Sequence, residues 1–311
     1  MKPYNDYSSY LKQKYGCKVY RIGLDAGFDC PNRDGTKGEG GCIYCNAGGS
    51  RSAYTDPSLP VAGQLSARID YLKKTRLATK FIAYFQAFTN TYGPVNRLKG
   101  AYDTVLPFED IVGITIGTRP DTIDREKLEL ISSYADTRDV WIEYGLQSIH
   151  DKTLAAIKRG HSFRDFLNAS QLTKDLNIKT CVHVILGLPG ETKEDMMQTA
   201  RKISELKVDG VKIHLLHILK GSGLEKLYSE GKVRLLEQDE YVRLVCDFLE
   251  NLSPDMIIQR LTGQGRRGEH IAPAWAPDKI ETINKIEEGL NRRNSCQGKA
   301  ISSSRSLSSR S

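Results

Sequence analysis

The sequence predicts an α/β fold in which helices alternate with the strands of a parallel sheet. Two observations support this class. Short β-branched and aromatic runs recur along the chain, and the segments between them carry apolar residues at helical spacing. Such alternation implies parallel strands joined by right-handed crossovers. The six strand–helix units that we count are too few for a complete eight-stranded barrel. An open, partial barrel or a doubly wound sheet remains, and in both the sites lie at the carboxyl ends of the strands.

The expected strands are short apolar runs, and residues 257–261 are a candidate for one more. In chain order the six runs are 19–24, 80–86, 111–116, 140–146, 180–186 and 210–216.

The expected helices begin with a tyrosine- and lysine-rich segment at 1–18. The clearest is 60–77, where Leu65, Ile69 and Leu72 recur at helical spacing. The remaining ones are 95–106, 125–134, 151–158, 163–176, 193–206, 224–231 and 238–252.

Composition divides the chain into four parts. An N-terminal helical segment (1–18) precedes the barrel (19–252), and a small C-terminal extension (253–294) follows it. Residues 295–311 are rich in serine and basic residues, so we expect a disordered tail.

The net charge of +7 is concentrated near the C-terminus. Residues 291–311 carry five basic and no acidic side chains, which leaves +2 for the rest of the chain. Charge is therefore weak support for nucleic-acid binding. No apolar run has the length of a membrane span, and the N-terminus lacks the apolar core of a signal peptide. The odd, uneven cysteine content is unlike a disulfide scaffold, so we expect a cytoplasmic protein.

The most informative stretch is a glycine-rich loop at 29–49, directly after the first strand. It holds Cys30, Cys42 and Cys45, with Tyr44 immediately before the last of them. Thiolates select zinc, copper(I) or iron–sulfur clusters. Three thiolates leave one position of a four-coordinate metal or of a four-iron cluster unfilled, as a catalytic centre requires.

The C-x11-C-x2-C pattern of this loop resembles the radical S-adenosylmethionine (SAM) superfamily, whose commonest spacing is C-x3-C-x2-C. The longer first gap is similar to that of the Elongator catalytic subunit and of short bacterial relatives without its acetyltransferase domain. Further stretches typical of that branch follow in order at 114–121, 142–148, 158–161 and 184–192. The resemblance covers roughly residues 15–260 and implies a partial (β/α)6 barrel of the TIM type.

The same resemblance implies the cofactors. Cys30, Cys42 and Cys45 would bind three irons of a [4Fe–4S] cluster, and the fourth iron would chelate SAM. One electron, from a donor such as flavodoxin or ferredoxin, would cleave SAM to methionine and a 5′-deoxyadenosyl radical that abstracts hydrogen from the substrate. The protein would position these groups and exclude water.

Seven residues are expected to contact SAM by this resemblance. By this resemblance Tyr44 would contact the adenine, and Gly187 would let the backbone approach the adenine edge. Gln86 would meet the amino group, and Glu143 the amino group or the ribose hydroxyls. Gln147 would contact SAM, Arg159 its methionine carboxylate, and His183 would lie near the ribose.

Each assignment has a structural alternative. Cys42 and Cys45 could form half of a zinc site that Cys30 and either Cys17 or a histidine complete. Glu143 could pair with Arg119, because an unpaired buried carboxylate is costly. Gln147 and Arg159 could brace a helix, and His183 could be a core histidine. The turn before residue 193 could simply place Thr192 as a helix N-cap.

The substrate is the more open question. The Elongator-like branch acts on wobble uridine in tRNA, so the resemblance implies a tRNA substrate modified at the C5 side chain. A flexible basic loop at 262–270 could approach RNA or could be a solvated surface loop. A radical enzyme acting on a small metabolite or tetrapyrrole is one alternative. A zinc-stabilised nucleic-acid-binding protein is another, of a different class.

Overall fold

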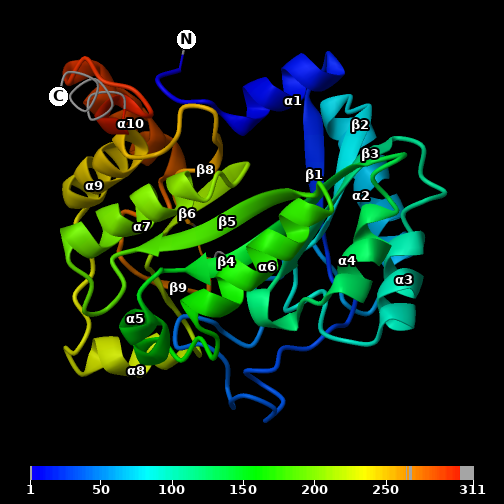
Figure 1. Cartoon of the computed structure of the whole chain (residues 1–311), viewed down its shortest axis with the longest axis horizontal. Coiled ribbons are helices and arrows are strands. Elements are labelled where there is room, and N and C mark those ends of the chain that lie inside the picture. Colours follow the sequence, from blue (N-terminus) through cyan, green and yellow to red (C-terminus); the bar gives the residue numbers. More distant parts are fainter. Residues whose placement is uncertain (1, 264, 266–267, 302–311) are drawn as a thin grey trace.

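The structure is a computed structural model that describes residues 2–263, 265 and 268–301. Its centre is a curved sheet of seven parallel strands in the order β1-β2-β3-β4-β5-β6-β8 (Figure 1). The strands are β1 (Val19–Leu24), β2 (Lys80–Phe85), β3 (Ile111–Thr118), β4 (Asp139–Gln147), β5 (Lys179–Leu186), β6 (Gly210–Leu215) and β8 (Ile257–Arg260). All six expected strands are therefore confirmed, and the candidate at 257–261 is a seventh at the edge of the sheet. The α/β partial barrel is the fold of this chain.

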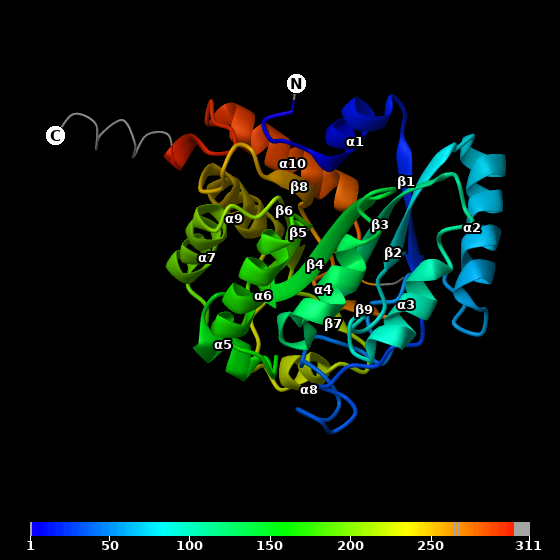
Figure 2. The same cartoon turned by 45° about the vertical axis from the view of Figure 1, so that its right-hand side comes forward.

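Helices connect the strands, and most of them cover the outer face of the sheet, whereas α5 and α8 lie near the carboxyl ends of the strands (Figure 2). Each of them overlaps a helix expected from the sequence. They are α2 (Val61–Arg76), α3 (Val95–Asp103), α4 (Arg125–Ser132), α5 (Asp151–Ala156), α6 (Phe163–Asp175), α7 (Lys193–Glu205), α8 (Gly223–Ser229) and α9 (Gln238–Glu250). Among the described residues, no helix is both long and apolar enough to cross a membrane.

The N-terminal helix α1 (Tyr7–Tyr15) closes the amino end of the barrel. It is shorter than the expected 1–18 because Asp6 caps its first turn and Gly16 ends it in a left-handed conformation. The backbone carbonyl of Asn5 accepts a hydrogen bond from the Ile258 amide at 2.8 Å. Tyr7 packs with residues of both edge strands and of the sheet centre. This helix therefore bridges the gap between β1 and β8.

The C-terminal region holds elements that sequence patterns did not predict. Helix α10 (Lys279–Arg292) packs on α9, and β7 (Ile218–Leu219) pairs with β9 (His270–Ala272) in an antiparallel ribbon. The expectation of disorder from residue 295 is wrong for 295–301. Gln297 is buried and donates to the carbonyls of Ser253 and Met256, at 2.6 and 2.8 Å. Residues 302–311 lie outside the described part of the chain.

The side chains that face the barrel interior form layers, because alternate residues of a strand point to the same face. The layer at the amino end is apolar and includes Ile82, Trp141 and Cys181, which pack against α1. The middle layer is charged and polar. The layer at the carboxyl end contains glycine on three strands, at Gly23, Gly117 and Gly145. Absent side chains leave space there for loops and ligands.

Candidate functional site

The carboxyl ends of the strands surround a cavity of about 550 Å³. All three cysteines of the glycine-rich loop line it. Six of the seven residues predicted to contact SAM line the same cavity: Tyr44, Gln86, Glu143, Gln147, Arg159 and His183. The seventh, Gly187, lies elsewhere. One cavity therefore gathers side chains from six strands of the sheet, β2 to β6 and β8, and from the cysteine loop.

The cysteine loop is fixed by contacts to the far side of the barrel mouth. The side-chain amide of Asn32 donates to the carbonyls of Lys158 and Arg159, both at 2.8 Å. The Ile43 amide donates to the Ile157 carbonyl at 3.1 Å. A Cβ on Gly160, whose φ is +72°, would lie 2.2 Å from Oδ1 of Asn32, so this approach requires glycine. The loop is thus held by the segment between α5 and α6.

Two of the three thiols lie beside arginines. Sγ of Cys42 is 3.6 Å from Nη1 of Arg159 and 3.4 Å from Nδ2 of Asn32. Burial opposes ionisation of Cys42, but Arg159, Tyr44 and Arg119 together outweigh it, so the pKa of this thiol is below its usual value. Sγ of Cys45 is 3.3 Å from Nη2 of Arg33. Burial dominates there and raises the pKa of Cys45.

The donor set suits an iron–sulfur cluster. Among the residues with a described position, no three His, Cys, Asp or Glu side chains are grouped to hold a single metal ion. Cys30, Cys42 and Cys45 line one cavity, and they fit a cluster because each thiolate there binds its own iron. The guanidinium groups of Arg33 and Arg159 would offset its negative charge.

The zinc alternative with Cys17 as the fourth ligand is wrong. Cys17 precedes β1 whereas Cys30 follows it, so the two thiols lie toward opposite ends of a six-residue strand. Cys17 instead accepts a hydrogen bond from Thr79, with the Oγ1–Sγ distance at 3.8 Å.

Gln86, predicted to meet the SAM amino group, is held by hydrogen bonds within the protein. Oε1 of Gln86 accepts from Ser52 Oγ at 2.9 Å, and its amide nitrogen donates to the Ser50 carbonyl at 2.6 Å. Gln147 is buried and has a φ of +75°, in the left-handed region, where β4 shifts register against β5. A strained backbone at a cavity wall is characteristic of functional positions.

Arg159 braces the end of β4. Its Nε and Nη2 donate to the Gly145 carbonyl at 3.1 and 2.8 Å. Its own carbonyl accepts from Nη1 of Arg119 at 2.8 Å. Arg119 in turn binds both carboxylate oxygens of Asp121, at 2.9 and 2.8 Å. The alternative pairing of Glu143 with Arg119 is therefore wrong, because Asp121 already occupies that guanidinium.

Glu143 belongs to a buried network in the middle layer of the barrel. Its Oε1 accepts from Arg21 Nη2 at 2.5 Å, while Oε2 accepts from Lys212 and lies 2.9 Å from His183 Nε2. Burial alone would raise the pKa of Glu143, but Arg21 and Lys212 hold it well below its usual value. Burial lowers the pKa of His183 to about 4, so its ring is neutral near pH 7. Burial likewise lowers the pKa of Lys212 to about 7.

Sequence reasoning missed Arg21 and Lys212. A signal existed, because each is a single charged residue inside an otherwise apolar strand. The period of two puts both on the face of their strands that points into the barrel. Lys212 is 2 % exposed, and an unpaired buried ammonium is costly.

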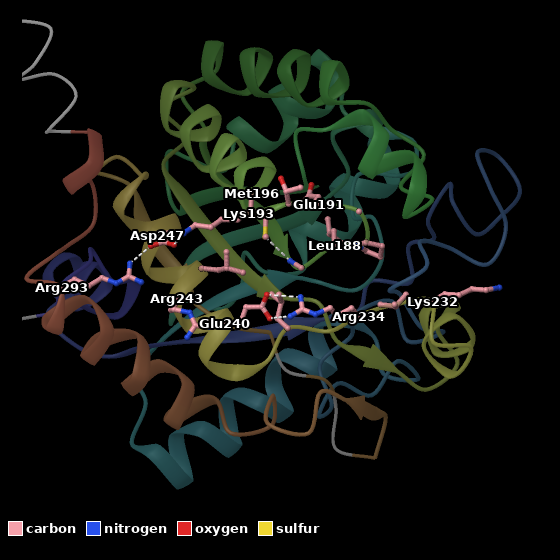
Figure 3. A pocket seen from close by; sticks show the side chains of 17 residues that line it. Leu188, Glu191, Lys193, Met196, Lys232, Arg234, Glu240, Arg243, Asp247 and Arg293 are labelled. Carbon is pink, nitrogen blue, oxygen red and sulfur yellow. Dashed lines mark hydrogen bonds and ion pairs between the residues drawn. The ribbon is translucent and has the colours of Figure 1, made fainter.

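Gly187 lines a separate groove of about 710 Å³, shown in Figure 3. Its amide lies 3.4 Å from the Met196 sulfur, and a Cβ there would lie 2.9 Å from Leu236. The position predicted for the adenine edge therefore faces the groove rather than the cysteine cavity. The Thr192 side chain accepts a hydrogen bond from the Asp195 amide and caps α7. The alternative prediction that this turn places Thr192 as a helix N-cap is therefore confirmed.

A sequence model of the radical SAM superfamily matches residues 30–203. The chain belongs to the radical SAM superfamily. Its members use a [4Fe–4S] cluster and SAM. A model of the radical SAM C-terminal domain matches residues 208–292, which include the unpredicted helix α10.

The chain is also similar to individual proteins, some over nearly its whole length and others over only part of it. YtqA of Bacillus subtilis, whose function is uncharacterised, is 40 % identical over 298 residues, covering 96 % of this chain and 92 % of YtqA. A tRNA uridine(34) acetyltransferase of Methanocaldococcus jannaschii is 28 % identical over 149 residues, covering 47 % of this chain and 27 % of that enzyme. The solved structure of archaeal Elp3 from Methanocaldococcus infernus has a TM-score of 0.64 at 18 % identity, over 90 % of this chain and 64 % of Elp3. That structural likeness shows the fold.

Proposed function

We propose that this radical SAM enzyme modifies the C5 side chain of wobble uridine in tRNA. The observation that carries the proposal is the similarity to a tRNA uridine(34) acetyltransferase over nearly half of the chain. The matched share of that enzyme is 27 %, so the similarity supports a shared radical domain and not its whole reaction. Arg33 and Arg51 also line the cavity, and because Arg51 is paired with Asp25 at 3.0 Å, Arg33 is the one of the two that would favour an anionic polymer at its mouth.

Cys30, Cys42 and Cys45 are the proposed cluster ligands. When bound, the cluster and SAM supply a 5′-deoxyadenosyl radical that abstracts hydrogen from the substrate. The protein groups around them bind, orient and exclude water. Arg159, which lies beside Cys42, would bind the methionine carboxylate, and Tyr44, which lines the cavity, would contact the adenine.

Gln86 and Gln147 are the proposed polar contacts to the methionine amino group. Gln86 is itself held by Ser52, which fixes the direction of its amide. His183, neutral and within 2.9 Å of Glu143, would face the ribose hydroxyls from the cavity wall. Glu143 is saturated by cations and so would act through His183.

The test compares tRNA nucleosides by mass spectrometry in cells with and without the gene. Loss of one modified wobble uridine, restored by the wild-type gene but not by a Cys42→Ala gene, is the expected result. Unchanged wobble uridines would refute the tRNA assignment. A parallel assay measures 5′-deoxyadenosine from SAM under dithionite, because that product reports the radical chemistry whatever the substrate.

A further inference from the structure

The middle layer of the barrel carries more positive charge than its carboxylate balances. Arg21, Lys212 and Arg260 face a single acid, Glu143, across the interior. Both oxygens of that acid are occupied by Arg21, Lys212 and His183. Buried charges in proteins are normally paired. This layer therefore has positive charge that no carboxylate of the layer neutralises.

Arg260 is the cation without a partner. Within the described residues its side chain makes no hydrogen bond or ion pair, although it is half-buried and lines the cysteine cavity. It is the register partner of Lys212 on the neighbouring strand, and Lys212 is the register partner of His183. Three strands therefore present these side chains in a row at the floor of the cavity.

One polar atom beside this row also lacks a partner. Nε2 of His214 is buried and makes no hydrogen bond with any described group. The His214 ring lies 5.1 Å from the His183 ring, centroid to centroid, and lines the cavity. In the tautomer with the proton on Nε2, His214 presents to the cavity a buried donor without an acceptor, which a bound anion would supply.

We propose that Arg260, Lys212 and His214 bind a terminal anionic group of the substrate, a carboxylate or a phosphomonoester, at the floor of the cavity. Guanidinium and ammonium donors bind both anions through charge-assisted hydrogen bonds. The group is terminal because a phosphate within an RNA backbone is joined to nucleotides on both sides, which a cavity of about 550 Å³ shared with SAM does not admit.

The proposed anion site rests on the proposed function in one respect: the cavity is where the substrate meets SAM. The site specifies the chemical class of the substrate group that enters the cavity. Lys212 supports it further, since burial lowers its pKa to about 7 and an adjacent anion would favour its charged form.

The groove in Figure 3 offers the matched control. Its cations are mostly paired there, Arg234 with Glu240 and both Lys193 and Arg293 with Asp247. Arg243 is exposed in this groove and forms no ion pair within the described part of the chain. An Arg243→Gln variant removes the same charge as Arg260→Gln, at a site outside the barrel.

The experiment titrates acetate and inorganic phosphate into anaerobically reconstituted enzyme with saturating SAM, with chloride added to hold ionic strength constant. Isothermal titration and the shift of the thermal midpoint report binding. We expect saturable binding that weakens about tenfold or more in Arg260→Gln and Lys212→Met, and that Arg243→Gln retains. Preference for acetate identifies a carboxylate, and preference for phosphate a phosphomonoester.

Several results would overturn the proposal. These are no saturable binding of either anion, equal binding by wild type and Arg260→Gln, loss of binding in Arg243→Gln, or displacement of the anion by SAM, whose own carboxylate would then be the ligand. Because Lys212→Met removes a buried charge, Arg260→Gln is the variant expected to fold unchanged. Anion binding with unchanged wobble uridines would leave this site intact and reject the tRNA substrate. Changed wobble uridines without anion binding would support the tRNA substrate and reject the anion site.

Discussion

Nη1 of Arg159 lies 3.6 Å from Sγ of Cys42, while the other two nitrogens of the same guanidinium bind the carbonyl of Gly145. One side chain thus connects the cysteine loop to the end of β4. The arginine is buried at 6 % exposure, so its charge acts with little screening by water. It supplies positive potential at the position where a cluster ligand and the methionine carboxylate of SAM are proposed to meet.

Replacing Arg159 should weaken SAM binding more than it changes the fold. We expect Arg159→Gln to raise the SAM dissociation constant by about tenfold or more, because one charge-assisted pair contributes roughly 1.5–3 kcal/mol. The SAM dissociation constant of Arg159→Lys should be intermediate, since lysine keeps the positive charge but lacks the planar pair of guanidinium donors. Equilibrium dialysis with the reconstituted variants measures this. The exposed Arg164→Gln is the control, and unchanged SAM affinity in Arg159→Gln would reject the role.

The three loop cysteines should be required for the cluster, and the remaining cysteines should not. Alanine at Cys30, Cys42 or Cys45 should reduce bound iron and the brown absorbance to near background, because each thiolate binds its own iron. The exposed Cys296 serves as a matched control. Iron analysis and absorbance after anaerobic reconstitution measure the effect. Full iron content in Cys42→Ala would contradict the ligand assignment.

Asp121 should make acid stability pH-dependent between about pH 4 and pH 2. Burial by itself would raise the pKa of this carboxyl, but hydrogen bonds from Arg119 and Lys37 lower it to about 2. A depressed pKa contributes stability above the unfolded value near 4, and that stability is lost as the pH falls through the folded value. The difference corresponds to about 2 kcal/mol.

Asp121→Asn should therefore lower the free energy of unfolding by about 2 kcal/mol at pH 7 and flatten its decline in acid. Urea unfolding at pH 2.5, 4 and 7 gives both quantities. Asp110→Asn is the comparison, because its pairing with Lys73 is surface-exposed and should be worth under about 1 kcal/mol. An equal pH profile in wild type and Asp121→Asn would show that the ion pair contributes nothing to folding.

Local patterns predicted the strands and the connecting helices because burial on both faces gives each parallel strand a continuous apolar run. They also placed the cysteines, whose spacing is a local property. Contacts between strands that lie far apart in the sequence could not be predicted from local patterns. The sequence showed that burying Glu143 without a partner would cost free energy. Its partners Arg21 and Lys212, however, lie 122 and 69 residues away in the sequence. The wrong alternative, Arg119, is nearer in sequence.

The missed elements share a different cause. Helix α10 lies between two turn-rich stretches and buries only part of its surface against α9. The ribbon of β7 and β9 is two and three residues long, too short for an alternating pattern to be visible. Residues 295–301 carry the composition of a disordered tail, yet Gln297 is fixed by backbone carbonyls near residues 253–256.

Removing iron should leave the barrel folded. Metal binding and folding are coupled when the site is absent from the unliganded chain. In this protein the loop has anchors of its own: Asn32 on the carbonyls of Lys158 and Arg159, and the Ile43 backbone hydrogen-bonded to Ile157 and to Leu224. We expect anaerobic chelation to abolish the cluster absorbance while the far-UV circular dichroism spectrum is retained. The thermal midpoint should fall by only a few degrees, about the effect of 1–2 kcal/mol in a domain of this size.

Asn32→Ala tests the cause of that expectation. Without its side-chain amide the loop loses two hydrogen bonds to the segment between α5 and α6, at a cost of about 1–3 kcal/mol. The iron-free variant should then show faster proteolysis within residues 30–45 than the iron-free wild type. Ser58→Ala, whose hydroxyl bonds only its neighbour Asp56 on the surface, should not. Unfolding of the wild-type barrel on chelation would mean that the cluster, and not these hydrogen bonds, holds the loop.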